Sequence, residues 1–466
     1  MRRAKIVCTM GPAVLAPGML EALVGAGMDC ARLNFSHGAH AEHLATAERV
    51  REAGRAVGKP VSLLVDLQGP KIRVGVFADG PIHLLAGSEF VLTGREVPSS
   101  RARASVSYPA LARDVKPGDM VLLDDGLLAL QVTRIEGDDV VCLVQVGGML
   151  SDRKGVNLPG AQLSVPALTD KDRLDLEFAV KEIRADYIAL SFVRRAVDLR
   201  EAKLLATGTP VIAKIEKPEA IDNLLSILDE ADGVMVARGD LGVELGSEKV
   251  PMAQKRVIRE ANKRGKLVIT ATQMLDSMIR NPRPTRAEAA DVANAILDGT
   301  DAIMLSGETA VGAYPLETVR MMDAITREAE REGAAWRDVR ELLGLADEWE
   351  FASGAAHAAA LLTYTLPLVA IVVATRDGKS AELLSSYRPR APIYALSADA
   401  RVAGRLASRW GIEPRVEPVA KDLDSLRALS SRVLQEAGFA VGASYALVLG
   451  IPLGERTNTV LLQKIN

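Results

Sequence analysis

Two carboxylates and a lysine stand at the ends of two apolar runs in the middle of the chain. Residues 211–215 predict a buried strand that carries Lys214 and is followed at once by Glu216. A second apolar run, residues 233–237, leads directly to Asp240. Magnesium in proteins takes one or two carboxylates and completes its shell with water and substrate oxygens, while a neighbouring ammonium stabilises a phosphoryl group or an enolate. The pattern predicts a hard-cation site, although each residue taken singly is equally compatible with a surface ion pair or a helix cap.

The elements that must position these residues alternate along the chain between apolar runs and segments of helical spacing. Strands are expected at residues 5–10, 29–33, 61–65, 187–192, 211–215, 233–237, 266–270 and 301–305. Helices are expected at residues 17–27, 39–57, 169–184, 196–206, 249–263 and 286–297. This alternation predicts an α/β fold, a (β/α)8 TIM barrel, whose strands end where catalytic residues gather.

Two further domains are expected because the pattern of predicted strands, helices and turns changes along the chain. Residues 71–163 contain short β-rich runs separated by turn signals, which predicts a small β-barrel lid inserted into a catalytic barrel made of residues 1–70 and 164–332. Such an insertion can close over substrate and exclude water. A charged segment with Trp336 and Trp349 then leads into residues 333–466, for which alternating strand and helix patterns predict a C-terminal α/β domain.

Composition narrows the class of protein. The 466 residues carry 57 basic and 60 acidic side chains, a formal net charge of −3, so no overall field favours nucleic acid or an anionic membrane. No apolar stretch is long enough to span a bilayer and the start has no apolar signal core, so a cytoplasmic location is expected. Cys8, Cys30 and Cys142 are too scattered for disulfides or a zinc site and are expected to be buried free thiols.

Several segments of the chain resemble the pyruvate kinase family. The barrel core resembles it in I-A-K-I-E-K-P-E, V-M-V-A-R-G-D-L-G-V-E and A-T-Q-M-L-D-S-M, and so do K-I-V-C-T-M-G-P, A-R-L-N-F-S-H-G, R-K-G-V-N-L-P-G and N-P-R-P-T-R-A-E. They follow the family's order over most of the first two thirds of the chain. The resemblance implies phosphoryl transfer from phosphoenolpyruvate to ADP, giving pyruvate and ATP in the last step of glycolysis, with Mg²⁺ or Mn²⁺ as cofactor and a homotetrameric assembly.

The resemblance also implies roles for individual residues. Those expected in catalysis are Lys214, Arg32, Arg73 and Thr272. Those expected to bind the substrate are Arg32, Lys214, Gly239, Asp240 and Thr272. Those expected at the nucleotide are Asn34, His37, Arg73 and Lys154, and those expected to hold Mg²⁺ are Glu216 and Asp240. Without the resemblance, a surface or capping histidine, a solvated loop lysine and a helix-cap threonine are equally good interpretations of His37, Lys154 and Thr272.

One motif departs from the best-known family pattern. Potassium-dependent members resemble D-T-K-G-P-E-I-R, whereas residues 66–73 here are D-L-Q-G-P-K-I-R, with Leu67, Gln68 and Lys71 at the three changed positions. The region of the monovalent cation is then expected around Asn34, Ser36, Asp66 and Leu67. A fixed ammonium on Lys71 can replace a bound K⁺ electrostatically, so the resemblance implies an enzyme that does not require potassium. The alternative is an ordinary exposed lysine.

The C-terminal domain contains a candidate phosphate loop. Hydroxyls, cations and a glycine lie between an expected strand and helix, at Thr375, Arg376, Gly378, Lys379 and Ser380. A helix N-terminus with these groups can cradle a phosphate. The loop resembles the family's allosteric effector site, which implies a sugar phosphate or AMP as effector, although Asp377 adds a negative charge that many sugar-bisphosphate binders lack. An ordinary strand–helix turn is the alternative.

Two other functions fit part of the same pattern. A Mg²⁺-dependent lyase or aldolase acting on a keto acid would need the carboxylates and a cation, but not ADP. A catalytically silent metabolite sensor would need only the loop of the third domain, and intact Lys214, Glu216 and Asp240 argue against it. ADP-dependent pyruvate formation separates the kinase from the lyase, and effector binding without turnover would favour the sensor.

Overall fold

The computed structural model describes residues 2–161, 163–332 and 351–466. Its central part is a closed barrel of parallel strands in the order β1-β16-β15-β14-β13-β12-β3-β2. The strands are β1 (Lys5–Thr9), β2 (Cys30–Asn34), β3 (Ser62–Asp66), β12 (Tyr187–Leu190), β13 (Val211–Ile215), β14 (Gly233–Ala237), β15 (Leu267–Ala271) and β16 (Ala302–Leu305). The expected TIM barrel is confirmed.

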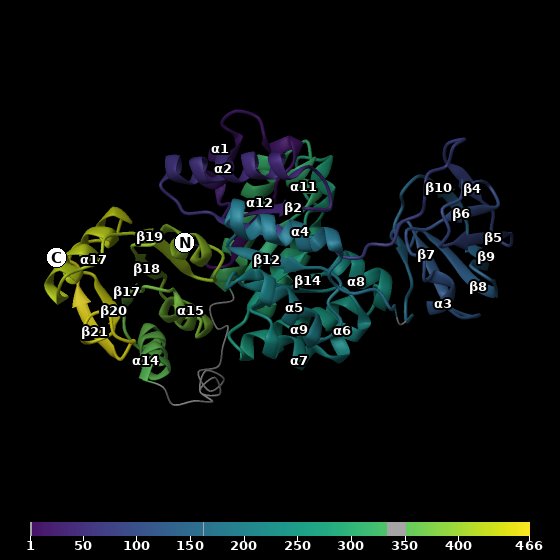
Figure 1. Cartoon of the computed structure of the whole chain (residues 1–466). Coiled ribbons are helices and arrows are strands. Elements are labelled where there is room, and N and C mark those ends of the chain that lie inside the picture. The colour runs from purple at the N-terminus through teal and green to yellow at the C-terminus, as the bar shows by residue number, and fades with distance from the viewer. Residues whose placement is uncertain (1, 162, 333–350) are drawn as a thin grey trace.

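Helices follow the strands and cover the outside of the barrel (Figure 1). The longer ones are α1 (Met19–Ala26), α2 (His40–Val57), α4 (Asp170–Phe178), α5 (Ala196–Ala206), α9 (Val250–Lys263), α10 (Arg286–Asp298) and α12 (Pro315–Glu332). Shorter ones are α6 (Pro218–Asp222), α7 (Leu224–Glu230), α8 (Arg238–Leu245) and α11 (Gly307–Ala310). The helix expected over residues 169–184 divides into α4 and a π-helical turn, η2 (Ala179–Ile183).

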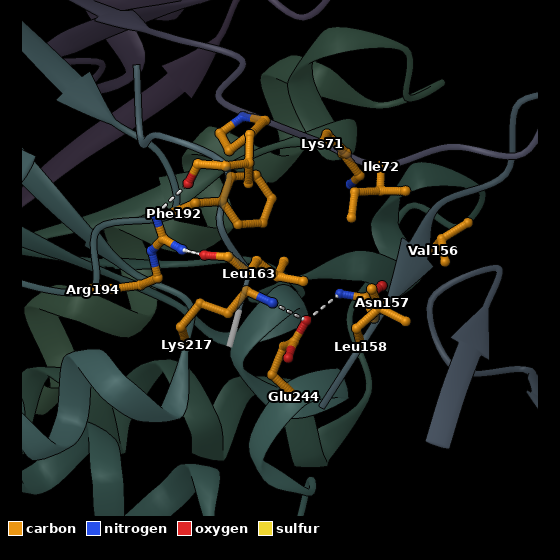
Figure 2. Close-up of a pocket in the computed structure, with 12 residues that line it drawn as sticks. Lys71, Ile72, Val156, Asn157, Leu158, Leu163, Phe192, Arg194, Lys217 and Glu244 are labelled. Carbon is orange, nitrogen blue, oxygen red and sulfur yellow. Dashed lines mark hydrogen bonds and ion pairs between the residues drawn. The ribbon is translucent and has the colours of Figure 1, made fainter. Parts of the chain in front are cut away.

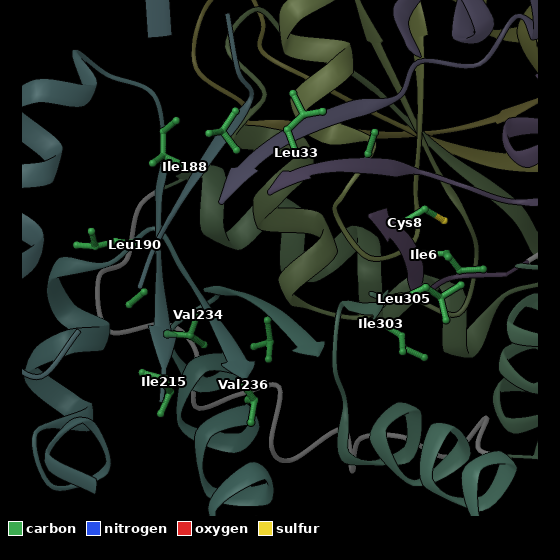
Figure 3. Packing of buried hydrophobic residues seen from close by; sticks show 14 of the residues in the cluster. Ile6, Cys8, Leu33, Ile188, Leu190, Ile215, Val234, Val236, Ile303 and Leu305 are labelled. Carbon is green, nitrogen blue, oxygen red and sulfur yellow. The ribbon is translucent and has the colours of Figure 1, made fainter. Parts of the chain in front are cut away.

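Alternation along the barrel strands produces two apolar layers. Ile6 and Cys8 of β1 lie in the layer between strands and helices, which Figure 3 shows, whereas Val7 lies in a separate cluster inside the barrel. The same inward positions become polar toward the carboxyl ends of the strands. The inward set therefore ends in Arg32, Asp66, Ser191, Lys214 and Glu216.

The inserted domain lies between β3 and α4 and has its own core. Its elements are β4 (Ile82–Leu84), β5 (Glu89–Thr93), β6 (Arg103–Ser105), α3 (Leu111–Asp114), β7 (Met120–Leu123), β8 (Leu128–Glu136), β9 (Asp139–Val146), β10 (Gly148–Leu150) and β11 (Val156–Asn157). They pair as a six-stranded sheet, β11-β7-β8-β9-β5-β6, and a separate ribbon of β10 and β4. Figure 1 shows this domain at the opposite side of the barrel from the C-terminal domain.

The C-terminal domain is an α/β sheet in the order β19-β18-β17-β20-β21, antiparallel only at β21. Its elements are α14 (Phe351–Thr365), β17 (Leu368–Ala374), α15 (Lys379–Ser386), β18 (Ile393–Ser397), α16 (Ala400–Leu406), β19 (Ile412–Val416), α17 (Leu423–Glu436), β20 (Ser444–Leu449) and β21 (Thr459–Lys464). Trp336 and Trp349 of the connecting segment lie outside the described residues.

The C-terminal domain docks against the amino ends of the barrel strands. Ser62 at the start of β3 donates a hydrogen bond to Gly404 O of α16 at 2.5 Å, and Arg388 forms a 2.8 Å ion pair with Asp301 before β16. Cys8, Cys30 and Cys142 are buried free thiols, as expected. Among the described residues, no helix has the length and apolar character needed to cross a bilayer.

Candidate active site

Asp66 holds two cations at the carboxyl end of the barrel. Its Oδ2 accepts a hydrogen bond from Arg32 Nε at 2.8 Å and lies 2.7 Å from Arg32 Nη2, while its Oδ1 is 3.2 Å from Lys214 Nζ. Burial raises the pKa of the Asp66 carboxyl, but Lys214 and Arg32 outweigh burial and hold that pKa below its usual value. Asp66 therefore stays ionised and fixes the positions of both cations.

Lys214 is the most constrained charge of this group. Its Nζ also lies 2.9 Å from Glu216 Oε1 and donates to Ser191 Oγ at 2.7 Å. Burial lowers the pKa of Lys214, yet the carboxylates of Asp66 and Glu216 outweigh it and raise the pKa above that of a free lysine. The side chain is thus a permanent ammonium held in one place at the mouth of the barrel.

Glu216 and Asp240 form the carboxylate side of the site. Glu216 is 1% exposed, and its Oε2 accepts the Phe192 N–H at 2.8 Å. Burial raises the pKa of Glu216 against the opposing effect of Lys214, and the nearby charge of Asp240 raises it further. A second carboxylate whose negative charge reaches Glu216 suits a divalent cation such as Mg²⁺, which usually takes one or two protein carboxylates. The residues present therefore fit the metal that the sequence predicts.

Thr272 sits in a strained turn directly after β15. Its φ of 71° is in the left-handed region, which β-branched residues rarely adopt. Arg238 holds the turn by donating from Nη2 to Thr272 O at 2.8 Å, and it is itself paired with Asp291 at 2.7 Å. Thr272 Oγ1 accepts the Gly239 N–H at 3.0 Å. The strain and these bonds place the hydroxyl beside the first turn of α8, where Asp240 lies.

Lys71 reaches the same side of the barrel from the start of the inserted domain. Its Nζ is 3.6 Å from Asp240 Oδ1, and both side chains are about equally half-buried. Lys71 is therefore neither isolated nor fully exposed. The motif D-L-Q-G-P-K thus brings a positive charge to one of the two predicted metal ligands.

Arg73 lies at the start of the inserted domain, and Lys154 lies near its end. Arg73 pairs with Gly155 in an isolated bridge and donates from Nη1 to Arg153 O at 3.1 Å. Lys154 forms a 2.8 Å ion pair with Asp124. In this structure both cations are engaged within the inserted domain, and their place at a nucleotide remains a prediction.

A buried polar cluster joins the inserted domain to the barrel, as Figure 2 shows. Lys217, which follows Glu216, forms a 2.6 Å ion pair with Glu244 of α8, and Asn157 of β11 donates to the same Glu244 oxygen at 2.8 Å. Glu244 and Asp240 are one helical turn apart. The cluster, here called the hinge cluster, therefore links the inserted domain to both elements that carry the predicted metal ligands.

The remaining residues predicted near the nucleotide and the monovalent cation are more widely placed. Asn34 ends β2, and its Oδ1 accepts the Ser36 N–H at 3.2 Å. His37 is exposed, with its carbonyl accepting from His43 at 2.8 Å. The side chain of Leu67 is 1% exposed and packs in the core between strands and helices, so only its backbone, which accepts from Ser191 Oγ, faces the site.

The predicted phosphate loop is the turn between β17 and α15. Gly378 adopts φ 89° and donates its N–H to Thr375 Oγ1 at 2.9 Å. Asp377 Oδ1 accepts the Lys379 N–H at 3.1 Å, which is one of the free donors at the start of α15. The carboxylate of Asp377 thus occupies a group that a phosphate would use. Arg376 is exposed, and Ser380 Oγ lies 2.6 Å from Thr457 Oγ1.

Sequence reasoning missed several residues that hold the site together. Ser191 binds Lys214, Thr9 accepts from Arg32 Nη1 at 3.0 Å, and Phe192 supplies its N–H to Glu216. Ser191 and Thr9 lie on the inward face of barrel strands or their ends, a signal that strand alternation could have given. No local pattern indicated that Phe192 adopts φ 56° and turns its N–H toward Glu216.

The fold and the site define an α/β-barrel enzyme whose cations at the carboxyl ends of the strands suit an anionic substrate. Comparison with known families agrees: the family model described as "Pyruvate kinase, barrel domain" matches residues 1–319, and "Pyruvate kinase, alpha/beta domain" matches residues 354–463. The chain belongs to the pyruvate kinase family, whose members are phosphotransferases.

Three relatives illustrate the extent of the similarity. The pyruvate kinase of Geobacillus stearothermophilus is 43% identical over 470 residues, which cover 99% of this chain and 80% of that protein. The pyruvate kinase of Staphylococcus saprophyticus is 46% identical over 475 residues, with the same two shares. That of Staphylococcus aureus is 44% identical over 476 residues, covering 100% of this chain and 80% of its own length.

Proposed function

We propose that this enzyme transfers the phosphoryl group of phosphoenolpyruvate to ADP, giving pyruvate and ATP, at the site built on Asp66. The observation that carries the assignment is the arrangement of two partly buried cations, Arg32 and Lys214, on one ionised carboxylate at the carboxyl ends of the barrel strands. Phosphoryl transfer needs fixed positive charge more than covalent chemistry by the protein, because its transition state spreads charge over the phosphoryl oxygens.

Arg32 and Lys214 would interact with different parts of the substrate. Arg32 presents a planar guanidinium, oriented by Asp66 and Thr9, that suits the phosphate oxygens. Lys214 places a permanent charge where the group leaves its oxygen. Because Asp66, Glu216 and Ser191 already hold Lys214, little reorganisation is needed as negative charge develops.

Glu216 and Asp240 would hold Mg²⁺. Gly239, in the same first turn of α8 as Asp240, would contact the substrate. A bound Mg²⁺ would supply charge neutralisation for substrate oxygens and for the enolate left after transfer. Thr272, with its hydroxyl next to Gly239, is the proposed donor or relay of the proton that the enolate carbon takes up.

The inserted domain would close over the site with the nucleotide. Lys154 and Arg73 would exchange their present partners, Asp124 and Arg153 O, for nucleotide phosphates. Asn34 and His37, after β2, would lie along the same nucleotide path. Closure of this kind excludes water, which competes with ADP for the phosphoryl group.

Independence from potassium is the second part of the proposal. Lys71 lies 3.6 Å from Asp240, so its ammonium already provides positive charge beside the predicted metal ligand. Asn34, Ser36, Asp66 and the backbone of Leu67 are the proposed neighbours of the region where a monovalent cation would otherwise bind. A fixed ammonium makes such a cation unnecessary.

Regulation and assembly are proposed from the family relationship. The loop containing Thr375, Arg376, Gly378, Lys379 and Ser380 would take a phosphorylated effector, a sugar phosphate or AMP, provided that Asp377 gives up the Lys379 N–H. We further propose a homotetramer in the cytoplasm, where the substrates of glycolysis occur. Light scattering on the purified chain tests the tetramer.

The assignment is tested by measuring pyruvate formation from phosphoenolpyruvate with saturating Mg²⁺, first without and then with ADP, in a buffer free of potassium and sodium. Turnover that requires ADP supports the kinase. Pyruvate released at the same rate without ADP would instead indicate a lyase-type or hydrolytic reaction at this site, and no turnover in either condition would contradict the assignment.

A further inference from the structure

A cluster of titratable side chains that the proposed mechanism does not use lies between the start of α2 and α4. Its centre is the carboxylate of Asp175, which is 3% exposed. Asp175 Oδ1 lies 2.7 Å from His40 Nε2, and Asp175 Oδ2 lies 2.5 Å from Lys171 Nζ, one turn earlier on α4. The ring of His40 stacks on that of Phe178 with centroids 4.1 Å apart. Asp175 therefore fixes a lysine of its own helix and a histidine of α2.

Lys171 extends from α4 to the loop that follows β2. Its Nζ donates a hydrogen bond to Phe35 O at 2.8 Å, while the Phe35 N–H donates to Asp66 O at 2.9 Å. Phe35 follows Asn34 directly and stands two residues before His37. The peptide groups on both sides of Phe35 are thus held, one by the barrel and the other by α4. This fixes the backbone between the two residues predicted at the nucleotide.

The rest of the loop is anchored to α2. The side chain of Phe35 is 2% exposed, and its ring stacks on that of His43 with centroids 4.3 Å apart. His43 Nε2 also lies 2.8 Å from His37 O. These contacts hold the loop against the helix that follows it, whereas Lys171 ties it to a helix 136 positions further along the chain.

The next residue of α4 holds the neighbouring loop. Asp172 is 0% exposed, and its Oδ1 accepts the Gly69 N–H at 3.0 Å. Gly69 adopts φ 68°, and a Cβ at this position would lie 2.8 Å from Ser191 Cβ, so the loop after β3 is closely confined. This loop leads to Lys71. Consecutive residues of α4 therefore contact the two loops that carry the predicted nucleotide and monovalent-cation residues.

A helix-stabilising ion pair alone does not account for the contacts of Lys171. Lys181 and Glu177 have the same four-residue spacing and the same 2.5 Å separation, but their side chains are 65% and 58% exposed. Such exposed pairs contribute little to stability. Asp175, by contrast, is buried, and Lys171 has a loop carbonyl as a further partner. A charged donor shared between a buried carboxylate and a carbonyl is a stronger restraint.

We propose that Lys171 is a positioning residue for the nucleotide. By holding the Phe35 carbonyl, it keeps the loop after β2 in the conformation that presents Asn34 and His37 to ADP, while Asp175 keeps the ammonium in place. A loop that is held before ADP binds loses less conformational freedom when ADP binds, so the affinity for ADP is higher. The inference rests on the proposed function, which puts this loop on the nucleotide path.

Phosphoenolpyruvate should not depend on Lys171 in the same way. Asp66 holds Arg32 and Lys214 through direct ion pairs. Removing the Lys171 ammonium leaves these pairs intact, so it should weaken the binding of one substrate and not of the other. A general loss of stability would affect both substrates.

The test is steady-state kinetics of the full chain at saturating Mg²⁺, with the KM for ADP and the KM for phosphoenolpyruvate measured separately. Lys171→Met removes the ammonium, and Lys171→Arg retains a charged donor of similar reach. Lys181→Met, which breaks the exposed pair of the same spacing, is the matched control. Calorimetric titration with ADP and Mg²⁺ in the absence of phosphoenolpyruvate measures the affinity directly, and urea denaturation measures stability.

We expect Lys171→Met to raise both the KM and the Kd for ADP by about ten-fold, with the KM for phosphoenolpyruvate and kcat within about two-fold of wild type. Lys171→Arg should restore most of the affinity, and Lys181→Met should match wild type. An unchanged KM for ADP, or a parallel rise in both KM values with a lower urea midpoint, would overturn the proposal. Pyruvate formation by wild type that needs no ADP would instead overturn the proposed function, and this inference with it.

Discussion

At the residue scale, ion pairs and hydrogen bonds hold the charged side chains of the candidate site in position. Asp66 orients Arg32 and Lys214, and Glu216 and Ser191 complete the contacts of Lys214. Lys71 adds a further charge beside Asp240. Each of these side chains therefore has a partner. Removing that partner, or reversing its charge, should change turnover in a direction that can be predicted.

Lys71→Glu should create a requirement for potassium, because it replaces a fixed ammonium with a carboxylate near Asp240. In potassium-free buffer its turnover should fall by about ten-fold or more, and added K⁺ should restore much of it, whereas wild-type turnover should change little. Lys71→Met, which removes the charge without adding an acid, is the matched control and should respond less to K⁺. Equal turnover of Lys71→Glu with and without K⁺ would refute charge substitution.

Thr272→Ala should lower kcat by about 10²-fold while the KM for phosphoenolpyruvate stays nearly constant, because general acid catalysis acts on the protonation step rather than on binding. Thr272→Ser keeps the hydroxyl and should retain most of the activity. Steady-state kinetics of both variants distinguish the roles. A rise in KM with unchanged kcat would show that Thr272 serves substrate binding alone.

At the element scale, the hinge cluster connects the inserted domain to the barrel through groups that are buried together. Glu244 of α8, Lys217 after β13 and Asn157 of β11 come from three elements, and the Glu244 side chain is 1% exposed. Charges buried in this way are costly when one partner is removed, because the other remains without compensation.

Glu244→Ala should lower the free energy of unfolding by about 3–5 kcal/mol, since it leaves the Lys217 ammonium buried and unpaired. The double variant Glu244→Ala/Lys217→Met should recover a substantial part of that loss. Urea denaturation measures both. The control is Glu436→Ala, which breaks an exposed pair with Arg432 and should cost only about 0–1 kcal/mol. Simple additivity of the two hinge substitutions would contradict the account.

How much could be predicted from sequence differs between elements. The strand ends that carry Arg32, Asp66, Lys214 and Glu216 could be located because apolar runs and strand alternation specify both an end and a face. The contact between Asn157 and Glu244 could not, because it joins residues 87 positions apart that no local pattern relates. Asp377 was recognised as an unusual charge, but its bond to the Lys379 N–H required the turn geometry.

At the scale of the whole molecule, the candidate active site and the docked C-terminal domain lie at opposite ends of the same strands. β3 begins at Ser62, which bonds to α16 of the C-terminal domain, and ends at Asp66. Asp186, directly before β12, accepts the Leu63 N–H at 2.7 Å. Docking of the C-terminal domain is therefore connected by one short strand to Asp66, the carboxylate that positions Arg32 and Lys214.

Asp186 should make stability depend on pH. Burial raises the pKa of its carboxyl from the ordinary 3.8 to about 7, against smaller opposing effects of the Leu63 N–H and Arg51. Between these pH values the folded chain keeps a proton that the unfolded chain has lost, so the free energy of unfolding falls as pH rises from 3.8 to about 7. Asp186→Asn, whose amide oxygen can still accept the Leu63 N–H, should flatten this dependence in denaturation measured across that range. An equally steep fall in the variant would contradict it.

The most direct test of the central claim is the turnover of Lys214→Met in ADP-dependent pyruvate formation, beside wild type and the exposed control Lys181→Met. We predict that kcat of Lys214→Met falls by about 10²- to 10³-fold, with an unchanged circular dichroism spectrum, because the charge that stabilises the transferring phosphoryl group is gone. Lys181→Met should match wild type. Near-normal turnover of a folded Lys214→Met enzyme would contradict the assignment of phosphoryl transfer to the site built on Asp66.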